Sequence, residues 1–383
     1  MTTRPTPRVA LVHDWLVSQR GGENVLRELC RLFPGAPIYT LVHAPGSVVD
    51  DIEAHPIRTS FLQRVWQRTG KFRPLLPIFP RAVESFDLSV YDLIVSTSHC
   101  VAKGVHTHGE QRHISYIHTP MRYIWEQLPD YLPNLPGKEK FWTPLARGLT
   151  VPLRRWDIES AQRPHHLIAN SRNVAQRIAE YWRRDADVVY PPVEVDFFAE
   201  GATTPAVERK GYLAVSALVP YKRVDLAVRW ATRYNKALTV IGSGSELPRL
   251  QKLAGPSVEF IGAGSPSALR QAYQNARALL FCGVEDFGIV PLEAMAAGCP
   301  IIARGKGGAR ETVRAEGPEA TGVFFDEPTV EALNNAAEAL EVALRAGKCT
   351  PDILRRHASG FAPANFREGM LQIINAKLKE LGF

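Results

Sequence analysis

The segment from Glu285 to Gly298 carries the residues best suited to chemistry in this sequence. A buried strand is predicted just before it, and Pro291 suits the first turn of a helix that ends at Gly298. Backbone N–H groups in the first turn of a helix have no internal acceptor, so they point at a ligand. The three amides expected there are those of Gly288, Ile289 and Val290. Such a helix start binds anions, and this one suits a diphosphate.

Glu285 and Glu293 flank the predicted anion site. A carboxylate beside a phosphate repels the ligand unless it accepts hydrogen bonds from ligand hydroxyls, and a nucleotide sugar has hydroxyls at both ends. We therefore expect Glu285 to contact a sugar and Glu293 a ribose. The alternative is that Glu285 is a solvated loop residue and Glu293 an exposed helix residue, which is the commoner case for a random pair of glutamates.

Other residues that could bind a ligand also follow predicted strands. Gly21 and Gly22 come between an apolar run and a helical pattern, and glycines let the backbone approach a phosphate or sugar closely. His118 ends a predicted strand, where ligands of open α/β sheets bind. Lys222 starts a helix after another strand and can serve a diphosphate as a point charge. Taken alone, each has a simpler interpretation: a turn, a structural histidine and a solvated lysine.

These residues are positioned by an alternation of strands and helices in both halves of the chain, which predicts α/β architecture with parallel sheets. The strands expected in the N-terminal half begin with residues 8–13 and continue with 36–42, 91–96, 113–118 and 165–170. Those expected in the C-terminal half are 212–219, 237–241, 258–261, 278–282, 300–303 and 323–325. The stiff pair Pro191-Pro192 predicts a domain boundary nearby.

Composition sets limits on the class of protein. A chain of 383 residues fits two domains, and 45% apolar with 22% charged residues indicates a globular protein. The net charge of +7 suits anionic substrates or membranes, but no nucleic-acid-binding signature accompanies it. No apolar run approaches the length of a membrane span. The cysteines have no metal-ligand spacing and are expected to be reduced thiols in a cytoplasmic protein: Cys30, Cys100, Cys282, Cys299 and Cys349.

The Glu285-seven-residues-Glu293 spacing resembles the signature of retaining glycosyltransferases of family 4, which have the two-domain GT-B fold. Further stretches share the resemblance: His13-Asp14-Trp15, Gly21-Gly22-Glu23, His118-Thr119-Pro120, Ala169-Asn170-Ser171 and Leu218 to Arg223. In that family the first glutamate contacts the donor sugar and the second the ribose. The resemblance implies the catalytic residues Glu285, His118 and Lys222. It implies the donor-binding residues Gly21, Gly22, Lys222, Arg223, Phe287, Gly288, Ile289, Val290 and Glu293.

The resemblance also implies the fold and the domains. We expect two Rossmann-like, doubly wound domains that face each other across a cleft. Residues 1–195 would bind the acceptor and residues 196–360 the nucleotide sugar, and a C-terminal helix within 361–383 would return to the N-terminal domain. One departure concerns Ala217, because many members have an arginine there. A second phosphate cation would then come from Arg223, Lys306 or Arg310.

The resemblance is nearest to bacterial polysaccharide mannosyltransferases. The expected reaction moves a hexose, with mannose from GDP-mannose favoured, to a glycan or lipid-linked acceptor in surface polysaccharide biosynthesis. No cofactor or metal is required, since no Asp-x-Asp pair stands at a strand end. Three alternatives remain open: a UDP-sugar-dependent transferase, a sugar-nucleotide 2-epimerase of the same fold, and a protein that only binds glycans or membranes.

The segment 58–81 has six basic residues, no acidic ones and several aromatic residues. It could lie on an anionic membrane, where each basic residue contributes about 1 kcal/mol. The enzyme would then be peripheral on the inner face of the cytoplasmic membrane. The alternative is that the apolar residues belong to the core and the basic ones are solvated, as charge runs usually are. The basic residues are Arg58, Arg64, Arg68, Lys71, Arg73 and Arg81.

Overall fold

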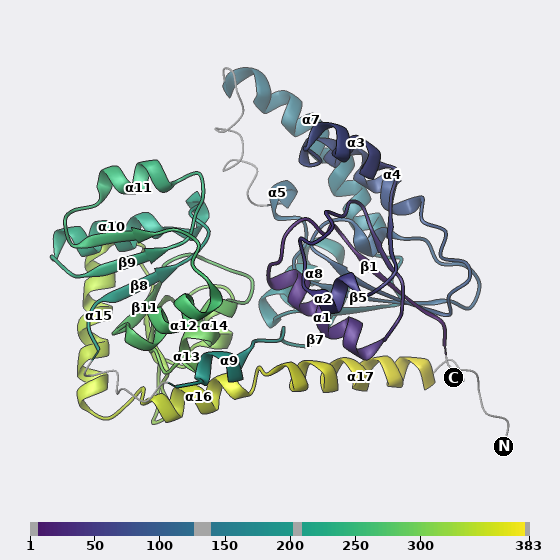
Figure 1. Ribbon diagram of the computed structural model, residues 1–383. Helices are drawn as coiled ribbons and strands as arrows, with labels where there is room; N and C mark the ends of the chain where they lie inside the picture. Colours follow the sequence, from purple (N-terminus) through teal and green to yellow (C-terminus); the bar gives the residue numbers. More distant parts are fainter. Residues whose placement is uncertain (1–6, 126–138, 202–208, 380–383) are drawn as a thin grey trace. The chain divides into compact units, whose positions relative to one another are not determined.

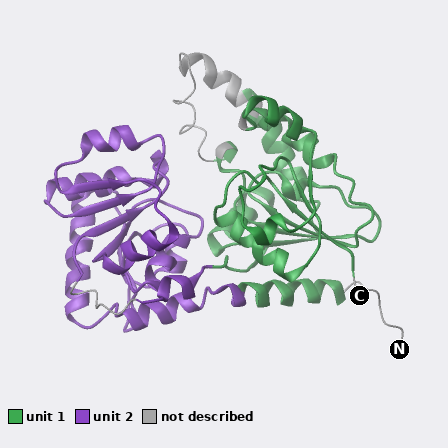
Figure 2. Cartoon of the chain, in the orientation of Figure 1, with its two compact units in different colours: residues 1–192, 366–383 green, residues 193–365 purple. Residues whose placement is uncertain are grey.

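The computed structural model describes residues 7–125, 139–201 and 209–379, and the chain forms two compact units (Figure 2). Unit 1 comprises Met1–Pro192 and Phe366–Phe383, and unit 2 comprises Val193–Asn365. The sequence predicts these boundaries after residues 195 and 360. The first comes earlier because the Val193 amide already donates to the carbonyl oxygen of Phe361, at 2.9 Å, within unit 2.

The described part of unit 1 contains a seven-stranded parallel sheet in the order β3-β2-β1-β4-β5-β6-β7. Strands β1, β5 and β7 of this sheet are labelled in Figure 1. The strands are β1 Val9–His13, β2 Ile38–Thr40, β3 Ile57–Thr59, β4 Leu93–Ser98, β5 Arg112–Ile117, β6 His166–Ala169 and β7 Asp187–Val188. Its helices are α1 Gly21–Leu32, α2 Asp50–Glu53, α3 Leu62–Thr69, α4 Phe79–Glu84, α5 Arg122–Trp125, α7 Glu139–Ser160, α8 Arg172–Trp182 and α17 Pro363–Lys379, with the 3₁₀ turns η1 Arg73–Ile78 and η2 Ala102–Gly104.

The described part of unit 2 contains a six-stranded parallel sheet in the order β10-β9-β8-β11-β12-β13. The strands are β8 Tyr212–Val215, β9 Leu238–Ile241, β10 Val258–Ile261, β11 Ala278–Phe281, β12 Ile301–Arg304 and β13 Gly322–Phe325. Its helices are α9 Val195–Ala199, α10 Val224–Arg233, α11 Leu247–Leu253, α12 Pro266–Asn275, α13 Ile289–Ala296, α14 Ala309–Thr312, α15 Val330–Arg345 and α16 Pro351–Ser359, with the turn η5 Pro220–Lys222.

Both sheets have the strand order of doubly wound Rossmann-like folds, so the predicted fold class is confirmed. The sequence misses the short edge strands β3 and β7, and it extends β8 beyond Val215, where the strand ends. In each sheet the chain order reverses between two central strands, β1 and β4 in unit 1 and β8 and β11 in unit 2. Ligands of such sheets bind beyond the carboxyl ends of these strands.

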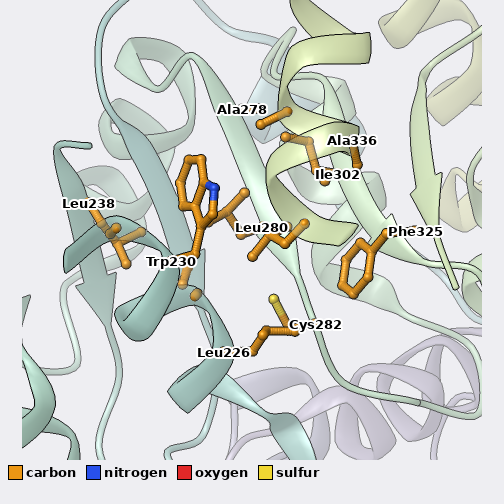
Figure 3. Packing of buried hydrophobic residues seen from close by; sticks show 14 of the residues in the cluster. Leu226, Trp230, Leu238, Ala278, Leu280, Cys282, Ile302, Phe325 and Ala336 are labelled. Carbon is orange, nitrogen blue, oxygen red and sulfur yellow. The ribbon is translucent and has the colours of Figure 1, made fainter. Parts of the chain in front are cut away.

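The core of unit 2 fixes the central strands of its sheet. Trp230 of α10 is fully buried and lies among Leu226, Leu238 and Leu280 (Figure 3). Its indole N–H donates to Oδ1 of Asn334 in α15 at 3.2 Å, so the polar atom of this large side chain is satisfied. Helices α10 and α15 therefore pack into one core with β8 and β11, whose carboxyl ends are held in place.

The C-terminal helix α17 packs on unit 1. The Phe366 ring lies 5.6 Å from the ring of Tyr116 in β5, and Phe366, Met370 and Ile374 belong to one buried cluster with strand and α1 residues of unit 1. Arg367 forms an ion pair with the buried carboxylate of Glu28 in α1. None of the described helices combines the length and the apolarity needed to cross a membrane.

Candidate functional site

A pocket in unit 2 lies where β8 and β11 end side by side, at the point where the strand order reverses. The wall from the first strand includes Ala214, Val215 and Ser216, and the wall from the second includes Phe281, Cys282 and Gly283. Lys222 and Glu285 also line it. Two of the residues predicted from the sequence therefore meet at the switch point of this sheet.

Lys222 and Glu285 form an ion pair in this pocket. Nζ of Lys222 lies 2.5 Å from Oε1 of Glu285, and the two side chains are 16% and 20% exposed. Lys222 ends the turn η5, and its ammonium also lies 5.3 Å from the centre of the Tyr221 ring. A Cβ on Gly283 would lie 2.9 Å from Cα of Lys222, so only glycine allows this approach of the two loops.

A glycine-rich loop of unit 2, residues 305–308, holds the Glu285 segment from the other side. The amide of Gly308 donates to the carbonyl oxygen of Glu285 at 2.8 Å. A Cβ on Gly308 would lie 2.3 Å from Cα of Phe287, which explains why a glycine stands there. The backbone that carries Glu285 is thus clamped between two loops.

Helix α13 begins at Ile289, directly after Gly288, whose φ of 97° favours glycine. The first-turn amides include those of Ile289 and Val290, two half-buried residues. Phe287 is 3% exposed and its ring packs 5.8 Å from that of Phe361. The side chain of Phe287 is therefore part of the core, and only its backbone is left for a ligand.

Glu293, also on α13, accepts a hydrogen bond at Oε2 from the hydroxyl of Tyr273 in α12, at 3.1 Å. Burial raises the pKa of Glu293 to about 7, the Tyr273 hydrogen bond acts against this shift, and the charge of Glu285 adds to it. The sequence gives no sign of Tyr273, because a tyrosine on a separate helix has no fixed spacing from the glutamate. Its position follows only from the packing of α12 beside α13.

The three candidates for a second phosphate cation differ in their partners. Nε of Arg223 donates to Oδ1 of Asp225 at 3.0 Å, and Arg223 itself adopts a left-handed conformation with φ 51°. Nε of Arg310 donates to the carbonyl oxygen of Gly305. Lys306 is exposed, and its side chain has no ion-pair partner among the described residues.

The remaining predicted residues lie in unit 1, where Gly21 and Gly22 follow β1 and His118 follows β5. Gly21 begins α1, and a Cβ on Gly22 would lie 3.7 Å from Nε2 of His118 and 3.8 Å from Cε1 of His13. Burial, together with the charges of His99 and His13, lowers the pKa of His118 to about 3. The imidazole of His118 is therefore neutral and can exchange hydrogen bonds with a hydroxyl, but it supplies no charge.

Four residues around Gly22 and His118 were not predicted as site residues, although three of them stand in the quoted motifs. Nδ1 of His13 is 2.5 Å from Oγ1 of Thr97, and Nε2 of His13 is 3.7 Å from Oε1 of Glu23. The buried carboxylate of Asp14 accepts hydrogen bonds from four consecutive amides, those of residues 99–102. Polar residues at the carboxyl ends of β1 and β4 are a sequence signal that could have identified His13, Asp14 and Thr97.

Within the described residues, no three His, Cys, Asp or Glu side chains come close enough together to hold a metal ion.

Comparisons with known proteins agree with this architecture. The chain is 29% identical over 227 residues to a D-inositol 3-phosphate glycosyltransferase of Mycobacteroides abscessus. The aligned region covers 54% of this chain and 50% of that protein. It is 31% identical over 172 residues to a GDP-mannose-dependent alpha-(1-6)-phosphatidylinositol monomannoside mannosyltransferase of Mycolicibacterium smegmatis, over 38% of this chain and 44% of the relative. The chain thus spans about half the length of the curated relatives it matches.

Two solved structures share the whole fold. Anabaena Alr3699/HepE in complex with UDP and glucose superposes with a TM-score of 0.66 and 15% identity, over 97% of this chain and 100% of that one. Sucrose-phosphate synthase from Thermosynechococcus elongatus gives a TM-score of 0.70 at 15% identity, over 97% and 99%. These similarities identify the fold as GT-B.

Family models match both units in turn. Residues 19–197 match the model described as Glycosyltransferase Family 4, and residues 200–342 match the model described as Glycosyl transferases group 1. Together the two matches cover most of the chain, which therefore belongs to the family 4 glycosyltransferases.

Proposed function

We propose that the chain is a retaining hexosyltransferase whose unit 2 binds a nucleotide sugar. The observation that carries the proposal is the meeting of Lys222 and Glu285 at the switch point of a parallel sheet, next to the start of α13. A cation and helix amides suit a diphosphate, and a carboxylate beside them suits sugar hydroxyls. Family membership supports the same assignment.

In this proposal the protein stabilises charge and positions the substrates. Lys222 and the α13 amides bind the diphosphate as its bond to the anomeric carbon breaks. The acceptor hydroxyl attacks from the leaving-group face and gives its proton to the departing diphosphate. Glu285 accepts hydrogen bonds from the sugar, and Glu293 from the ribose. The ion pair of Glu285 with Lys222 favours this scheme over a covalent intermediate on Glu285.

His118 and the loop of Gly21 and Gly22 supply neutral groups in unit 1. The neutral imidazole of His118 suits a hydroxyl of the donor sugar or of the acceptor. Gly22 lets a ligand approach the backbone beside it.

We take mannose from GDP-mannose as the donor because the names of relatives include GDP-mannose-dependent mannosyltransferases. The acceptor in the proposal is a glycan or lipid-linked saccharide of surface polysaccharide biosynthesis. A UDP-sugar is the alternative donor, and epimerisation of a nucleotide sugar is the alternative reaction.

The membrane surface proposed for this enzyme lies on α3. Two pairs of exposed residues stand one helical turn apart. One pair is apolar, Phe61 and Val65, and the other is basic, Arg64 and Arg68. The opposite face carries Leu62, which is buried. Charged and apolar side chains thus share the outward side of α3, which suits an anionic leaflet.

The structure corrects part of the prediction for segment 58–81. Leu62, Phe72 and Phe79 are buried in the core of unit 1, so they are not available as membrane anchors. Arg58 donates to the hydroxyl of Tyr39 at 2.8 Å. The side chain of Arg73 lies outside the described residues. Arg81 is exposed but lies on α4. We name the exposed residues in and directly beside α3 the α3 surface: Phe61, Arg64, Val65, Arg68 and Lys71.

Two measurements test the proposed activity. A nucleotide that binds only the folded state raises the melting temperature, so GDP, UDP and ADP are compared by thermal shift, and GDP is expected to give the largest shift. GDP-mannose is then incubated with the protein alone, and released GDP and mannose are followed by proton NMR. Slow hydrolysis with the α-anomer formed first supports a retaining transferase.

Other outcomes distinguish the alternatives. Formation of a new nucleotide sugar without GDP release indicates an epimerase. Turnover of UDP-glucose but not GDP-mannose reassigns the donor. Absence of any thermal shift with all three nucleotides contradicts the enzyme and favours a protein that only binds glycans or membranes.

A further inference from the structure

We propose that Glu285 makes unit 2 discriminate between an intact nucleotide sugar and the nucleoside diphosphate left after transfer, because Glu285 competes with the diphosphate for Lys222. This inference rests on the proposed function and concerns the same site. It assigns to Glu285 a second role, in product release, besides its contact with the sugar.

The ion pair is close and partly shielded from solvent. Nζ of Lys222 and Oε1 of Glu285 are 2.5 Å apart, and both side chains are less than a quarter exposed. Shielded pairs are screened by salt less than fully exposed ones. Any anion that binds Lys222 therefore shares this cation with a carboxylate that is already in place.

The backbone keeps Glu285 near Lys222. The carbonyl oxygen of Glu285 is bound by the Gly308 amide at 2.8 Å, and Gly283 packs against the backbone of Lys222. Because this segment is clamped on two sides, its carboxylate stays beside the lysine when a ligand arrives. The charge of Glu285 also reaches Glu293, whose pKa it helps to raise.

The two ligands differ in what they offer this carboxylate. In a nucleotide sugar the terminal phosphate is esterified, so it has one ionisable oxygen fewer, and the hydroxyls of the attached sugar can donate to Glu285. In a free nucleoside diphosphate the terminal phosphate carries a charge near −1.5 to −2 at neutral pH and brings no such donors. Glu285 thus accepts hydrogen bonds from the donor, whereas it only competes with the product for Lys222.

The test compares Glu285→Gln with wild type by isothermal titration with GDP and with GDP-mannose, and in parallel with UDP and UDP-glucose. Glutamine keeps the shape but removes the charge. We expect GDP to bind about fivefold tighter, which corresponds to ~1 kcal/mol. GDP-mannose should bind no tighter than to wild type, so the preference for the donor falls.

Two controls isolate the ion pair. Glu341→Gln removes an equal charge from the partly buried pair with Arg277, which precedes β11, whereas Glu285 follows it. This variant should leave both affinities unchanged. In a Lys222→Met background, Glu285→Gln should give a clearly smaller gain in GDP affinity, because the contested cation is gone.

Unchanged or weaker GDP binding by Glu285→Gln overturns the inference while leaving the proposed function intact. An equal gain for GDP and GDP-mannose also overturns it, since the effect would then be general repulsion. If wild type binds none of the four ligands, the proposed function itself fails.

Discussion

The hydroxyl of Tyr273 donates a hydrogen bond to Oε2 of Glu293 across 3.1 Å, which joins α12 to α13 at the proposed ribose contact. The same carboxyl has its pKa raised to about 7, mainly by burial. Glu293 therefore changes charge near neutral pH, and both ligand binding and stability should follow that change.

Nucleotide affinity should increase with pH because of Glu293. The ionised carboxylate accepts hydrogen bonds from both ribose hydroxyls, so binding favours release of its proton. Between about pH 6 and about pH 8 we expect the Kd of GDP to fall by about tenfold, or ~1.4 kcal/mol. Titration calorimetry measures the Kd of the same ligand for wild type and for Glu293→Gln at each pH. Ionisation of the phosphate changes both Kd values equally, so it cancels from their ratio. Identical pH profiles for the two proteins would exclude this linkage.

The stability of the free protein should change with pH in the opposite sense. Because the folded pKa of Glu293 lies above its ordinary value of 4.5, protonation favours the folded state. This stabilisation is fully present below pH 4.5 and is lost as the pH rises through about 7. The melting temperature of wild type minus that of Glu293→Gln should therefore decrease across this window and stay constant above it. A difference that increases with pH would contradict the shift.

Lys222→Ala should nearly abolish transfer and weaken GDP binding, since a hydrogen bond to a charged group is worth about 1.5 to 3 kcal/mol. The fold should survive because Lys222 is partly exposed. Ala217, which is exposed in the preceding loop, offers a rescue: Ala217→Arg in the Lys222→Ala protein should restore part of the affinity. Lys306→Ala tests the alternative phosphate cation. A larger loss of GDP affinity with Lys306→Ala than with Lys222→Ala would assign the phosphate contact to the loop of residues 305–308.

Asp14→Asn should destabilise unit 1. The carboxylate is buried, and an amide side chain would turn an N–H group toward the backbone donors of residues 99–102. We expect a loss of about 3 kcal/mol in the free energy of unfolding, measured in urea. Asp87→Asn is the exposed control and should change stability by less than about 0.5 kcal/mol. Equal values for the two variants would show that the Asp14 contacts are dispensable.

The α3 surface should bind anionic vesicles. In sedimentation with phosphatidylglycerol-rich liposomes at low salt, wild type should pellet, and with neutral liposomes it should not. Replacing Arg64, Arg68 and Lys71 by Gln should release it, because each basic residue contributes about 1 kcal/mol near such a surface. The matched control replaces three exposed basic residues of unit 2, namely Arg229, Lys236 and Lys252. Wild type in the supernatant with anionic vesicles would rule out this role and favour a soluble acceptor.

Much of the fold can be predicted from the sequence because local patterns decide it. Helix α8 begins directly after Ser171, a residue type that favours helix starts, and Oγ of Ser171 accepts a hydrogen bond from the Val174 amide. The strand-loop-helix alternation follows from apolar runs bounded by glycine and proline. Strands β3 and β7 are not predicted because such short edge strands have too few residues to form a recognisable pattern.

The partners within the site were decided only by tertiary structure. Lys222 and Glu285 were both predicted to bind ligand, but their ion pair depends on β8 and β11 being neighbours in the sheet, although they are more than sixty residues apart. The contact of Arg223 with Asp225 gives one expected phosphate cation a carboxylate partner, and the contact of Tyr273 with Glu293 adds an unexpected partner. The sequence by itself determined which chemical groups are present and on which elements. Strand order and helix packing determined which of them meet, because interactions between distant residues leave no local pattern.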